Sequence, residues 1–443
     1  MPCKIEKNPK TKTKLNRNMP RIHFIGIGGV GMNGLAQLAI HSGFEVSGSD
    51  RAYHPHAEPF RTLEHLGIQI FPQDASGISE ETDQVVFSTA IESDNLDLTR
   101  ANALRIPLLH RAEFLKQLIG DNPLIAVAGT AGKTTTTGML AWIFEQLGLD
   151  PSVYNGAGIL NWKQDGNLGN IRKGKGKYWI IEADESDRSF LKFHPEHAII
   201  TNISKDHYEL EELHRLFETF ESQVSHSIIR GAEEKPNILS SNTFLFQGLE
   251  FQISMLGMHN LENAFCAVRL CAEMGLDLKQ LQKALLQFKG IERRLEWVGE
   301  VDGIQIIDDY AHNAAKILAA ITAVAEGHRR VHVFWRPHGF APLFNGLNDL
   351  LETFKKAPAA SIHILPVYYA GGSVTRKVSS ADFVNRLQSA GLPATLVADY
   401  STLQKQLEQK AQSGDSILGM GARDPELPRF SQQLLQTWKT NAS

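Results

Sequence analysis

The sequence predicts an α/β protein of three domains, and three observations support this fold class. A glycine-rich turn at residues 26–31 separates a short apolar run from an amphipathic stretch, which is the order of a strand followed by a helix. A second such turn, about 100 residues later, follows the apolar run 124–128. A third series of strands and helices begins after Arg294. Two nucleotide-type turns this far apart belong to separate domains, so we expect domains at 21–120, 121–294 and 295–443.

Local periodicity predicts the elements within these domains. Residues 21–50 have the pattern of a βαβ unit whose second strand ends at Asp50. Residues 226–256 have the spacing of short strands with turns, and residues 257–288 that of helices broken near Gly275. We expect further helices at 210–224, 383–390 and 402–412. Further strands are expected at 84–88, 124–128, 178–184, 197–204, 291–312, 331–337, 360–367 and 415–422.

Composition argues against several classes of protein. The 443 residues include 45 Lys and Arg against 49 Asp and Glu, a balance that disfavours a nucleic-acid or anionic-membrane binder. The three cysteines contain no Cys-x-x-Cys spacing, which argues against a disulfide framework or a thiolate zinc site and favours a reducing cytoplasm. No apolar run reaches the length of about 18 residues that a membrane-spanning helix needs. Composition does not indicate the oligomeric state.

The first 20 residues differ from the rest of the chain. They carry six basic side chains against Glu6 and have almost nothing apolar to bury. We expect a disordered, solvated basic tail. The alternative is a basic arm for an anionic partner.

The second glycine turn, within AVAGTAGKTTTTGML at 126–140, has the chemistry of a phosphate-binding loop. Glycines let backbone N–H groups approach phosphate oxygens, Lys133 can bridge the outer phosphates, and Thr134 can offer its hydroxyl to Mg²⁺. The loop is shorter than a standard Walker A motif, because Val127 stands where that motif has its first glycine. We expect Lys133→Ala to abolish turnover without unfolding the chain. The residues expected around ATP are Gly129, Thr130, Ala131, Gly132, Lys133, Thr134 and Thr135.

The first glycine turn, GIGGVG, satisfies G-x-G-x-x-G, and Asp50 stands where a dinucleotide fold has its ribose-binding acid. Alone, this pattern predicts an NAD enzyme. We favour a UDP-sugar, because the next domain calls for ATP and the same turn can hold either pyrophosphate. The residues expected to bind it are Gly26, Gly28, Gly29, Val30, Gly31, Asp50, Ser88 and Thr89.

Acidic residues follow the strand in IIEADESDRSF at 180–190. Glu182 lies 25 residues before His207, which follows the next strand. A carboxylate and an imidazole from adjacent strand ends can ligate Mg²⁺ beside a γ-phosphate. The alternative reading of such a cluster is a solvated loop.

Three smaller features are open to a functional or a structural reading. Asn260 and Asn263 share one face at a helix start, which suits an adenine edge or a helix N-cap. Asp308 and Asp309 end a strand, and Arg294 stands at a domain boundary.

The ordered set GIGGVG, GTAGKTTTT, EADESD, NISKDH, GMHNLEN, RRLE and DDYAH resembles the Mur ligase family across residues 21–425. The resemblance implies a UDP-binding Rossmann-like N-terminal domain, a central P-loop ATPase domain with a parallel sheet, and a C-terminal Rossmann-like domain that closes over ATP and binds the incoming amine. The similarity is greatest to members that phosphorylate the lactyl carboxylate of UDP-N-acetylmuramate with ATP and join the acyl phosphate to L-alanine. Tripeptide-recycling members are the alternative.

The resemblance also implies roles for individual residues. Lys133 would hold the β- and γ-phosphates, Thr134 and Glu182 one Mg²⁺, and His207 a second. Arg294 would face the phosphates, and Asp309 the ribose or a hinge. Asn260 and Asn263 would face adenine, and His312 and His338 would lie in the acceptor region.

The sequence departs from the family pattern in its acceptor half. Ala131 replaces a histidine of the loop, Asn313 and Ala314 replace a His-Pro pair, and Gly339 replaces an arginine. Lys205 replaces an acid beside His207. These departures keep two alternatives open: another acceptor amine, or a paralogue that binds the nucleotides for regulation without catalysis.

Overall fold

The computed structural model describes residues 19–204, 209–326, 330–369 and 376–442 of the chain. The described residues form two compact units, the first ending at Gly120 and the second beginning at Asp121. The expected basic tail lies outside the described residues, apart from Met19 and Pro20.

The first unit is a Rossmann-like sheet with strand order β3-β2-β1-β4-β5, parallel throughout. Buried Phe24 and Phe114 meet edge to face in its core, with ring centroids 5.5 Å apart. The strands are β1 (Arg21–Ile25), β2 (Glu45–Ser49), β3 (Gln69–Phe71), β4 (Gln84–Phe87) and β5 (Leu108–His110). The helices are α1 (Val30–His41), α2 (Phe60–His65), α3 (Leu96–Ala103) and α4 (Arg111–Ile119). The strand order changes direction between β1 and β4, which is where ligands bind in open α/β sheets.

The second unit begins with a six-stranded sheet of order β11-β10-β6-β9-β7-β8, in which only β8 is antiparallel. The strands are β6 (Leu124–Ala128), β7 (Ser152–Tyr154), β8 (Ile171–Arg172), β9 (Trp179–Glu182), β10 (His197–Ile200) and β11 (Ser227–Arg230). The helices are α5 (Lys133–Gln146), the 3₁₀ turn η1 (Ser189–Lys192), α6 (Leu210–Glu221), α7 (Met258–Glu273) and α8 (Leu278–Leu286). The parallel sheet expected from the sequence is confirmed, and β8 is an addition at its edge.

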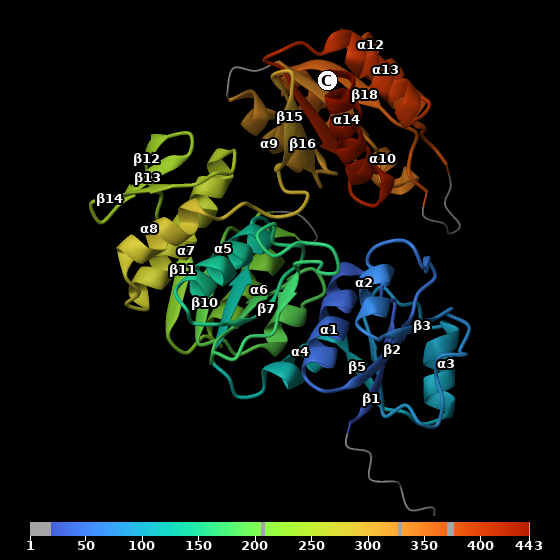
Figure 1. Ribbon diagram of the computed structural model, residues 1–443, viewed down its shortest axis with the longest axis vertical. Helices are drawn as coiled ribbons and strands as arrows, with labels where there is room; N and C mark the ends of the chain where they lie inside the picture. The colour runs from blue at the N-terminus through green and yellow to red at the C-terminus, as the bar shows by residue number, and fades with distance from the viewer. Residues whose placement is uncertain (1–18, 205–208, 327–329, 370–375, 443) are drawn as a thin grey trace, which may run out of the picture. The chain divides into compact units, whose positions relative to one another are not determined.

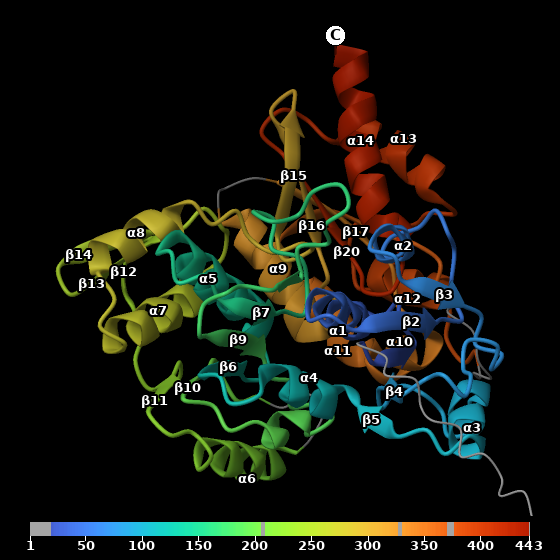
Figure 2. The same cartoon turned by 60° about the horizontal axis from the view of Figure 1, so that its bottom comes forward.

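A small antiparallel sheet lies against α8, as Figures 1 and 2 show. Its strands are β12 (Asn237–Ser240), β13 (Thr243–Phe246) and β14 (Leu249–Gln252). Phe244 and Phe251 stack within this sheet and join the apolar core around α5 and α7. The short strands expected at 226–256 are therefore present.

The rest of the second unit is a third sheet, of order β15-β16-β20-β17-β18-β19. Five of its strands are parallel, and β15 pairs antiparallel with β16. Apolar clusters on its two faces bury helices on both sides, as in a Rossmann-like fold. The strands are β15 (Glu296–Val301), β16 (Ile304–Asp309), β17 (Val331–Trp335), β18 (Ala359–Ile364), β19 (Ala394–Leu396) and β20 (Ser416–Met420). The helices are α9 (Ala314–Ala325), α10 (Phe340–Asn345), α11 (Leu347–Lys356), α12 (Ser380–Ser389), α13 (Tyr400–Lys410) and α14 (Glu426–Ala442).

Several expected strands end earlier in the structure, and two of them do so for a reason that bears on the site. The strand expected at 197–204 ends at Ile200, because Thr201 and Asn202 turn to hydrogen-bond the phosphate-type loop. The strand expected at 178–184 ends at Glu182, whose side chain turns to the same loop. Both strands therefore end where their polar side chains hydrogen-bond to the loop between β6 and α5.

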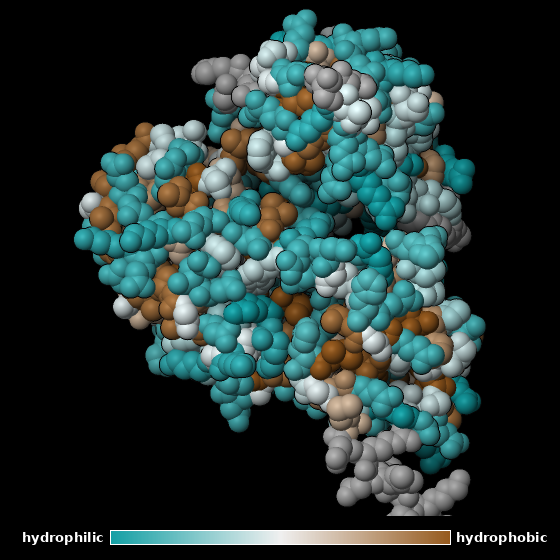
Figure 3. Space-filling model, viewed as in Figure 1, coloured by the Kyte–Doolittle hydropathy of each residue, from teal (hydrophilic) through white to brown (hydrophobic). Residues whose placement is uncertain are grey.

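The visible face in Figure 3 is mostly hydrophilic, with hydrophobic residues in small groups. Among the described residues, no helix combines the length and apolar character needed to cross a membrane.

Candidate functional site

The turn between β6 and α5 is a loop that only glycine can form at two positions. Gly129 and Gly132 have φ values of +128° and +83°. A Cβ at Gly129 would stand 2.1 Å from Thr201 Oγ1, and one at Gly132 would stand 2.4 Å from Asn263 Oδ1. The glycines therefore let the loop lie directly against the turn that follows β10 and against α7.

Asn202 fixes the middle of this loop. Its main-chain carbonyl accepts from Thr130 N at 3.0 Å, and its Oδ1 accepts from Thr130 Oγ1 at 2.7 Å and from Ala131 N at 3.1 Å. Thr201 Oγ1 and Asn202 Nδ2 both donate to the Ala131 carbonyl, at 2.5 and 2.9 Å. Sequence reasoning did not assign Thr201 or Asn202 to the site, although Asn202 stands within the NISKDH motif. The available signal was the adjacency of β10 and β6, which places the residues after both strands side by side.

The first residues of α5 meet an acid from β9. Thr134 Oγ1 donates to Glu182 Oε1 at 3.1 Å, and the other carboxylate oxygen accepts from Gly156 N at 2.8 Å. A Cβ at Gly156 would stand 2.3 Å from that oxygen, so the glycine makes room for the carboxylate. The structure thus brings Thr134 and Glu182 together at the loop, as the sequence predicted. A hydroxyl and a carboxylate are hard oxygen donors of the kind that Mg²⁺ prefers.

Lys133 turns toward two partners of its own. Its Nζ donates to the Gly129 carbonyl at 2.8 Å and to Glu185 Oε2 at 2.7 Å, and lies 3.9 Å from Asp184 Oδ1. Burial alone would lower the pKa of Lys133, but the carboxylates of Glu185, Glu182 and Asp184 together raise it. Burial raises the pKa of Glu185 in spite of the neighbouring ammonium. Glu185 is a further residue that sequence reasoning missed.

The proposed second metal ligand, His207, lies outside the described residues. Within the described ranges, no three His, Cys, Asp or Glu side chains converge in a way that could hold a metal ion. A cation at Thr134 and Glu182 would therefore need phosphate oxygens and water to complete its shell, which is the usual arrangement for Mg²⁺.

Asn260 and Asn263 begin α7 and are both buried. Asn260 Nδ2 donates to the Leu256 carbonyl at 2.7 Å, and the two side chains lie 3.4 Å apart. Asn263 is close enough to Gly132 to line the loop, whereas Asn260 holds the start of its own helix. The N-cap of α7 is Gly257, so neither asparagine has the N-cap role that the structural reading expected, and the adenine role stays a prediction.

Arg294 and Asp309 both lie at the link into the third sheet. The Arg294 guanidinium lies over the Tyr310 ring, 5.4 Å from its centroid. Asp309 Oδ2 and Oδ1 accept from Leu295 N and Ala311 N at 2.8 and 2.7 Å, so this buried carboxylate joins the start of β15 to the end of β16. No hydrogen bond or ion pair joins Arg294 to residues 129–134, all of which are described.

Arg293, which sequence reasoning passed over, anchors the same link. Its Nε donates to Asp308 Oδ2 at 2.9 Å, and its Nη1 donates to the Ala422 carbonyl at 3.0 Å. Asp308 is buried, and burial raises its pKa to about 7 although Arg293 opposes the shift.

The two histidines expected in the acceptor region lie together. The His312 and His338 rings meet edge to face with centroids 5.0 Å apart, and His312 Nδ1 contacts the Tyr310 carbonyl at 3.0 Å. Burial lowers the pKa of His312 to about 4, and burial together with the charge of Arg423 lowers that of His338. Both imidazoles are therefore neutral near pH 7 and can exchange hydrogen bonds with a polar ligand.

The first unit holds the other glycine turn at the carboxyl end of β1. Gly28 N donates to Asp50 Oδ2 at 2.8 Å, and a Cβ at Gly28 would stand 2.5 Å from the Phe60 ring. Asp50 thus closes the turn from the end of β2. Other expected residues follow the same strand ends: Gly26 and Gly29 precede α1, Val30 and Gly31 begin it, and Ser88 and Thr89 follow β4.

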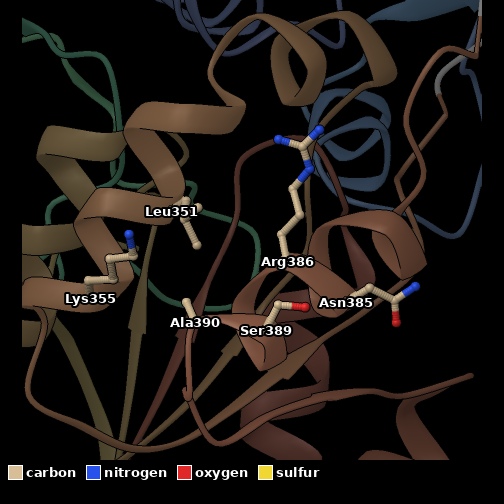
Figure 4. Close-up of a pocket in the computed structure, with 6 residues that line it drawn as sticks. All are labelled: Leu351, Lys355, Asn385, Arg386, Ser389 and Ala390. Atoms are coloured by element: carbon tan, nitrogen blue, oxygen red, sulfur yellow. The ribbon is translucent and has the colours of Figure 1, made fainter.

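An open depression lies on the third sheet's helices, and its lining includes none of the site residues described above. Leu351 and Lys355 of α11 line it together with side chains from α12 and its C-terminal end (Figure 4). The residues from α12 and its end are Asn385, Arg386, Ser389 and Ala390. None of them was expected in the site.

Comparisons with known proteins cover nearly the whole chain. Three family models match: "Mur ligase family, catalytic domain" at 21–122, "Mur ligase middle domain" at 127–222, and "Mur ligase, glutamate ligase domain" at 293–423. The UDP-N-acetylmuramate–L-alanine ligase of Cyanothece sp. is 33% identical across 93% of this chain and 95% of its own length.

Two solved structures of UDP-N-acetylmuramate ligases also resemble this chain. The UDP-N-acetylmuramate-alanine ligase of Thermotoga maritima superposes with a TM-score of 0.81 at 26% identity, covering 95% of this chain and 99% of its own. A UDP-N-acetylmuramate:L-alanyl-γ-D-glutamyl-meso-diaminopimelate ligase of Neisseria reaches a TM-score of 0.55 at 26% identity over 62% of this chain and 100% of its own.

Proposed function

The chain belongs to the Mur ligase family, and we propose that it is an ATP-dependent, ADP-forming ligase that joins the carboxylate of UDP-N-acetylmuramate to the amine of L-alanine. The observation that carries this proposal is the similarity, over 93% of the chain, to a ligase named for those two substrates. The product belongs to peptidoglycan precursor synthesis and so to cell-wall formation, cell shape and division.

The first half of the reaction transfers a phosphoryl group. A carboxylate oxygen of UDP-N-acetylmuramate attacks the γ-phosphorus of ATP, and the bond between that phosphorus and the oxygen bridging to the β-phosphate breaks. The products are ADP and an acyl phosphate. Catalysis of this step is mostly positioning and charge neutralisation. The backbone N–H groups at the start of α5 and the Lys133 ammonium supply these. Asn263 lies beside Gly132 at the same helix start.

Mg²⁺ would be held by the Thr134 hydroxyl and the Glu182 carboxylate. Their oxygens lie 3.1 Å apart at the loop, and the bond between them is one that a shared cation can replace. When bound, the ion neutralises charge on the terminal phosphates. A second ion at His207 is part of the same proposal.

The second half forms the amide bond. The acceptor's amine, having lost its proton, attacks the acyl carbon, and the tetrahedral intermediate expels inorganic phosphate. We assign the acceptor to the carboxyl ends of β16 and β17, where the ring centroids of His312 and His338 lie 5.0 Å apart. We assign the UDP moiety to the turn formed by residues 26–31 and Asp50 in the first unit.

A second candidate keeps the chemistry and changes the acceptor to a peptide. It is favoured by the departures at Asn313 and Gly339, and by the similarity to a ligase whose name specifies a tripeptide. In the structure Asn313 caps α9 by accepting from Lys316 N at 3.0 Å, and Gly339 stands before α10. Neither residue supplies a cation for a carboxylate, so the acceptor must find its charge partner elsewhere.

ADP release tests both candidates. The purified chain is given ATP, Mg²⁺ and UDP-N-acetylmuramate, and release is compared with L-alanine, with L-alanyl-γ-D-glutamyl-meso-diaminopimelate and without an acceptor. Stimulation that requires the UDP-sugar and is greatest with L-alanine supports the proposal. A peptide optimum supports the second candidate, binding of both nucleotides without turnover supports the regulatory paralogue, and ADP release that ignores every UDP-muramyl compound overturns all three.

We place the reaction in the cytoplasm, where ATP and nucleotide sugars are available. Cys266 and Cys271 are buried free thiols, as a reducing compartment allows. The proposed mechanism uses no thiol, nucleic acid or membrane.

A further inference from the structure

The Lys133–Glu185 ion pair is the feature of the loop that the proposed mechanism does not use. The two side chains are 12% and 2% exposed, and their charged atoms lie 2.7 Å apart. In the structure the ammonium is therefore engaged with a buried carboxylate, and it also donates to the Gly129 carbonyl of the loop.

Glu185 stands only three residues beyond Glu182. This one segment therefore supplies the acceptor for the Thr134 hydroxyl and the acceptor for the Lys133 ammonium. Of these two groups, Lys133 is the one assigned to the terminal phosphates, whereas Thr134 and Glu182 are assigned together to Mg²⁺. Glu185 therefore occupies the donor that the phosphate oxygens would otherwise accept from.

The roles of the two acids differ once a nucleotide arrives. Glu182 can still bind a cation that lies between it and the phosphates. Glu185 has no such role, because among the described residues Lys133 is its one ion-pair partner. When the ammonium swings to the phosphates, a buried carboxylate loses its partner beside newly arrived negative charge.

We propose that Glu185 is an internal competitor of the nucleotide, a positioning residue that pairs with Lys133 and thereby weakens ATP and ADP binding. This inference rests on the proposed function only for the statement that the loop binds ATP. The pair keeps the loop's ammonium ordered when the site is empty, and the cost of separating it lowers nucleotide affinity and favours product release.

The test measures the Kd of Mg·ADP by titration calorimetry for the full chain and for Glu185→Gln. The glutamine keeps the shape and one carbonyl acceptor but removes the charge, so we expect the Kd to fall by about tenfold. Asp184→Asn is the matched control, because it removes one negative charge from the residue just before Glu185. Asp184 Oδ1 lies 3.9 Å from Lys133 Nζ, and the Asp184 side chain is 35% exposed. Its Kd is expected to change by less than about twofold.

A gain in affinity cannot result from general damage to the fold, so it separates competition from mere structural support. If Glu185→Gln does not fold, Glu185→Asp draws the carboxylate back by one methylene, and the expected change has the same sign and a smaller size. A folded variant with unchanged or weaker nucleotide binding overturns this inference and leaves the proposed function standing. Absence of Mg·ADP and Mg·ATP binding by the unmodified chain overturns both.

Discussion

Asn263 of α7 lies so close to Gly132 that the loop and the helix can coexist only if residue 132 has no side chain. A Cβ on the glycine would stand 2.4 Å from Asn263 Oδ1 and 3.1 Å from its Cγ. The asparagine is buried and its Nδ2 already contacts Asn260 Oδ1, so it cannot turn away into solvent. The phosphate-type loop and the residue assigned to adenine are therefore one packed assembly.

We expect Gly132→Ala to weaken nucleotide binding strongly. The substitution forces a side chain into positive φ and against Asn263, at a cost of about 1–3 kcal/mol, and displaces the start of α5. Gly148→Ala is a matched control, because Gly148 follows the same helix at φ +73° and a Cβ there would meet nothing within 4 Å. The Kd of Mg·ADP should rise at least about tenfold for Gly132→Ala and stay unchanged for Gly148→Ala, while both lower the melting temperature. Equal nucleotide affinity in the two variants would contradict this reading.

Lys133→Met should remove activity and also destabilise the protein. The sequence-based expectation was that this loop lysine has no structural role, but its side chain is 12% exposed and pairs with Glu185. Losing the ammonium leaves a buried carboxylate unpaired, which costs about 3–5 kcal/mol. Adding Glu185→Gln to Lys133→Met should recover most of that stability without restoring turnover. Urea unfolding of the single and double variants measures the effect, and a double variant no more stable than Lys133→Met would count against it.

The sequence was a good guide to what is local and a poor guide to what meets across the fold. The β6–loop–α5 segment was predictable because an apolar run, two glycines and a helical stretch are consecutive. Glu185 and Asn202 were missed because they reach the loop from 52 and 71 residues away, through strand pairing that periodicity does not specify. β10 ends earlier than its apolar pattern predicts for the same reason, because Thr201 and Asn202 bond to a loop that is distant in sequence. The roles of the site residues and the domain limits stay predictions.

Glu182→Gln should raise the Mg²⁺ concentration needed for half-maximal ADP release by about ten- to one-hundredfold. The amide oxygen can still accept from Gly156 N, and the amide NH2 can donate to the Thr134 hydroxyl, in place of the two carboxylate oxygens that now accept at 2.8 and 3.1 Å. The fold should therefore persist while the charge that attracts the cation is lost. Glu250→Gln, in the small antiparallel sheet, removes one charge far along the chain and serves as the control. A Mg²⁺ requirement shared by the two variants would remove Glu182 from the metal site.

Acid should destabilise the second unit partly through His363. Burial, aided by the charge of Lys410, lowers the pKa of this imidazole to about 4, although its contact with Gln406 acts the other way. The unfolded chain takes up a proton near pH 6.5 and the folded chain does not, so stability present above pH 6.5 is lost as the pH falls to about 4. The full shift corresponds to about 3 kcal/mol. Urea unfolding of His363→Gln should show a shallower fall in stability between pH 7 and pH 4; a slope equal to that of the unmodified chain would refute the assignment.

His338→Gln should impair use of the acceptor and leave the nucleotide half intact. His338 meets His312 at 5.0 Å, and both imidazoles are neutral at working pH. His312 Nδ1 donates to the Tyr310 carbonyl, so His312 offers a ligand only its Nε2 acceptor, whereas His338 can offer one donor and one acceptor. We expect the KM for the acceptor amine to rise about tenfold while the KM for ATP changes by less than about twofold, since one hydrogen bond to a charged ligand is worth about 1.5 kcal/mol. His226→Gln, with a side chain 59% exposed, is the control and should change neither constant. Parallel changes in both KM values for His338→Gln would place this histidine at the nucleotide or in the support of the sheet, and the acceptor would then have to lie elsewhere.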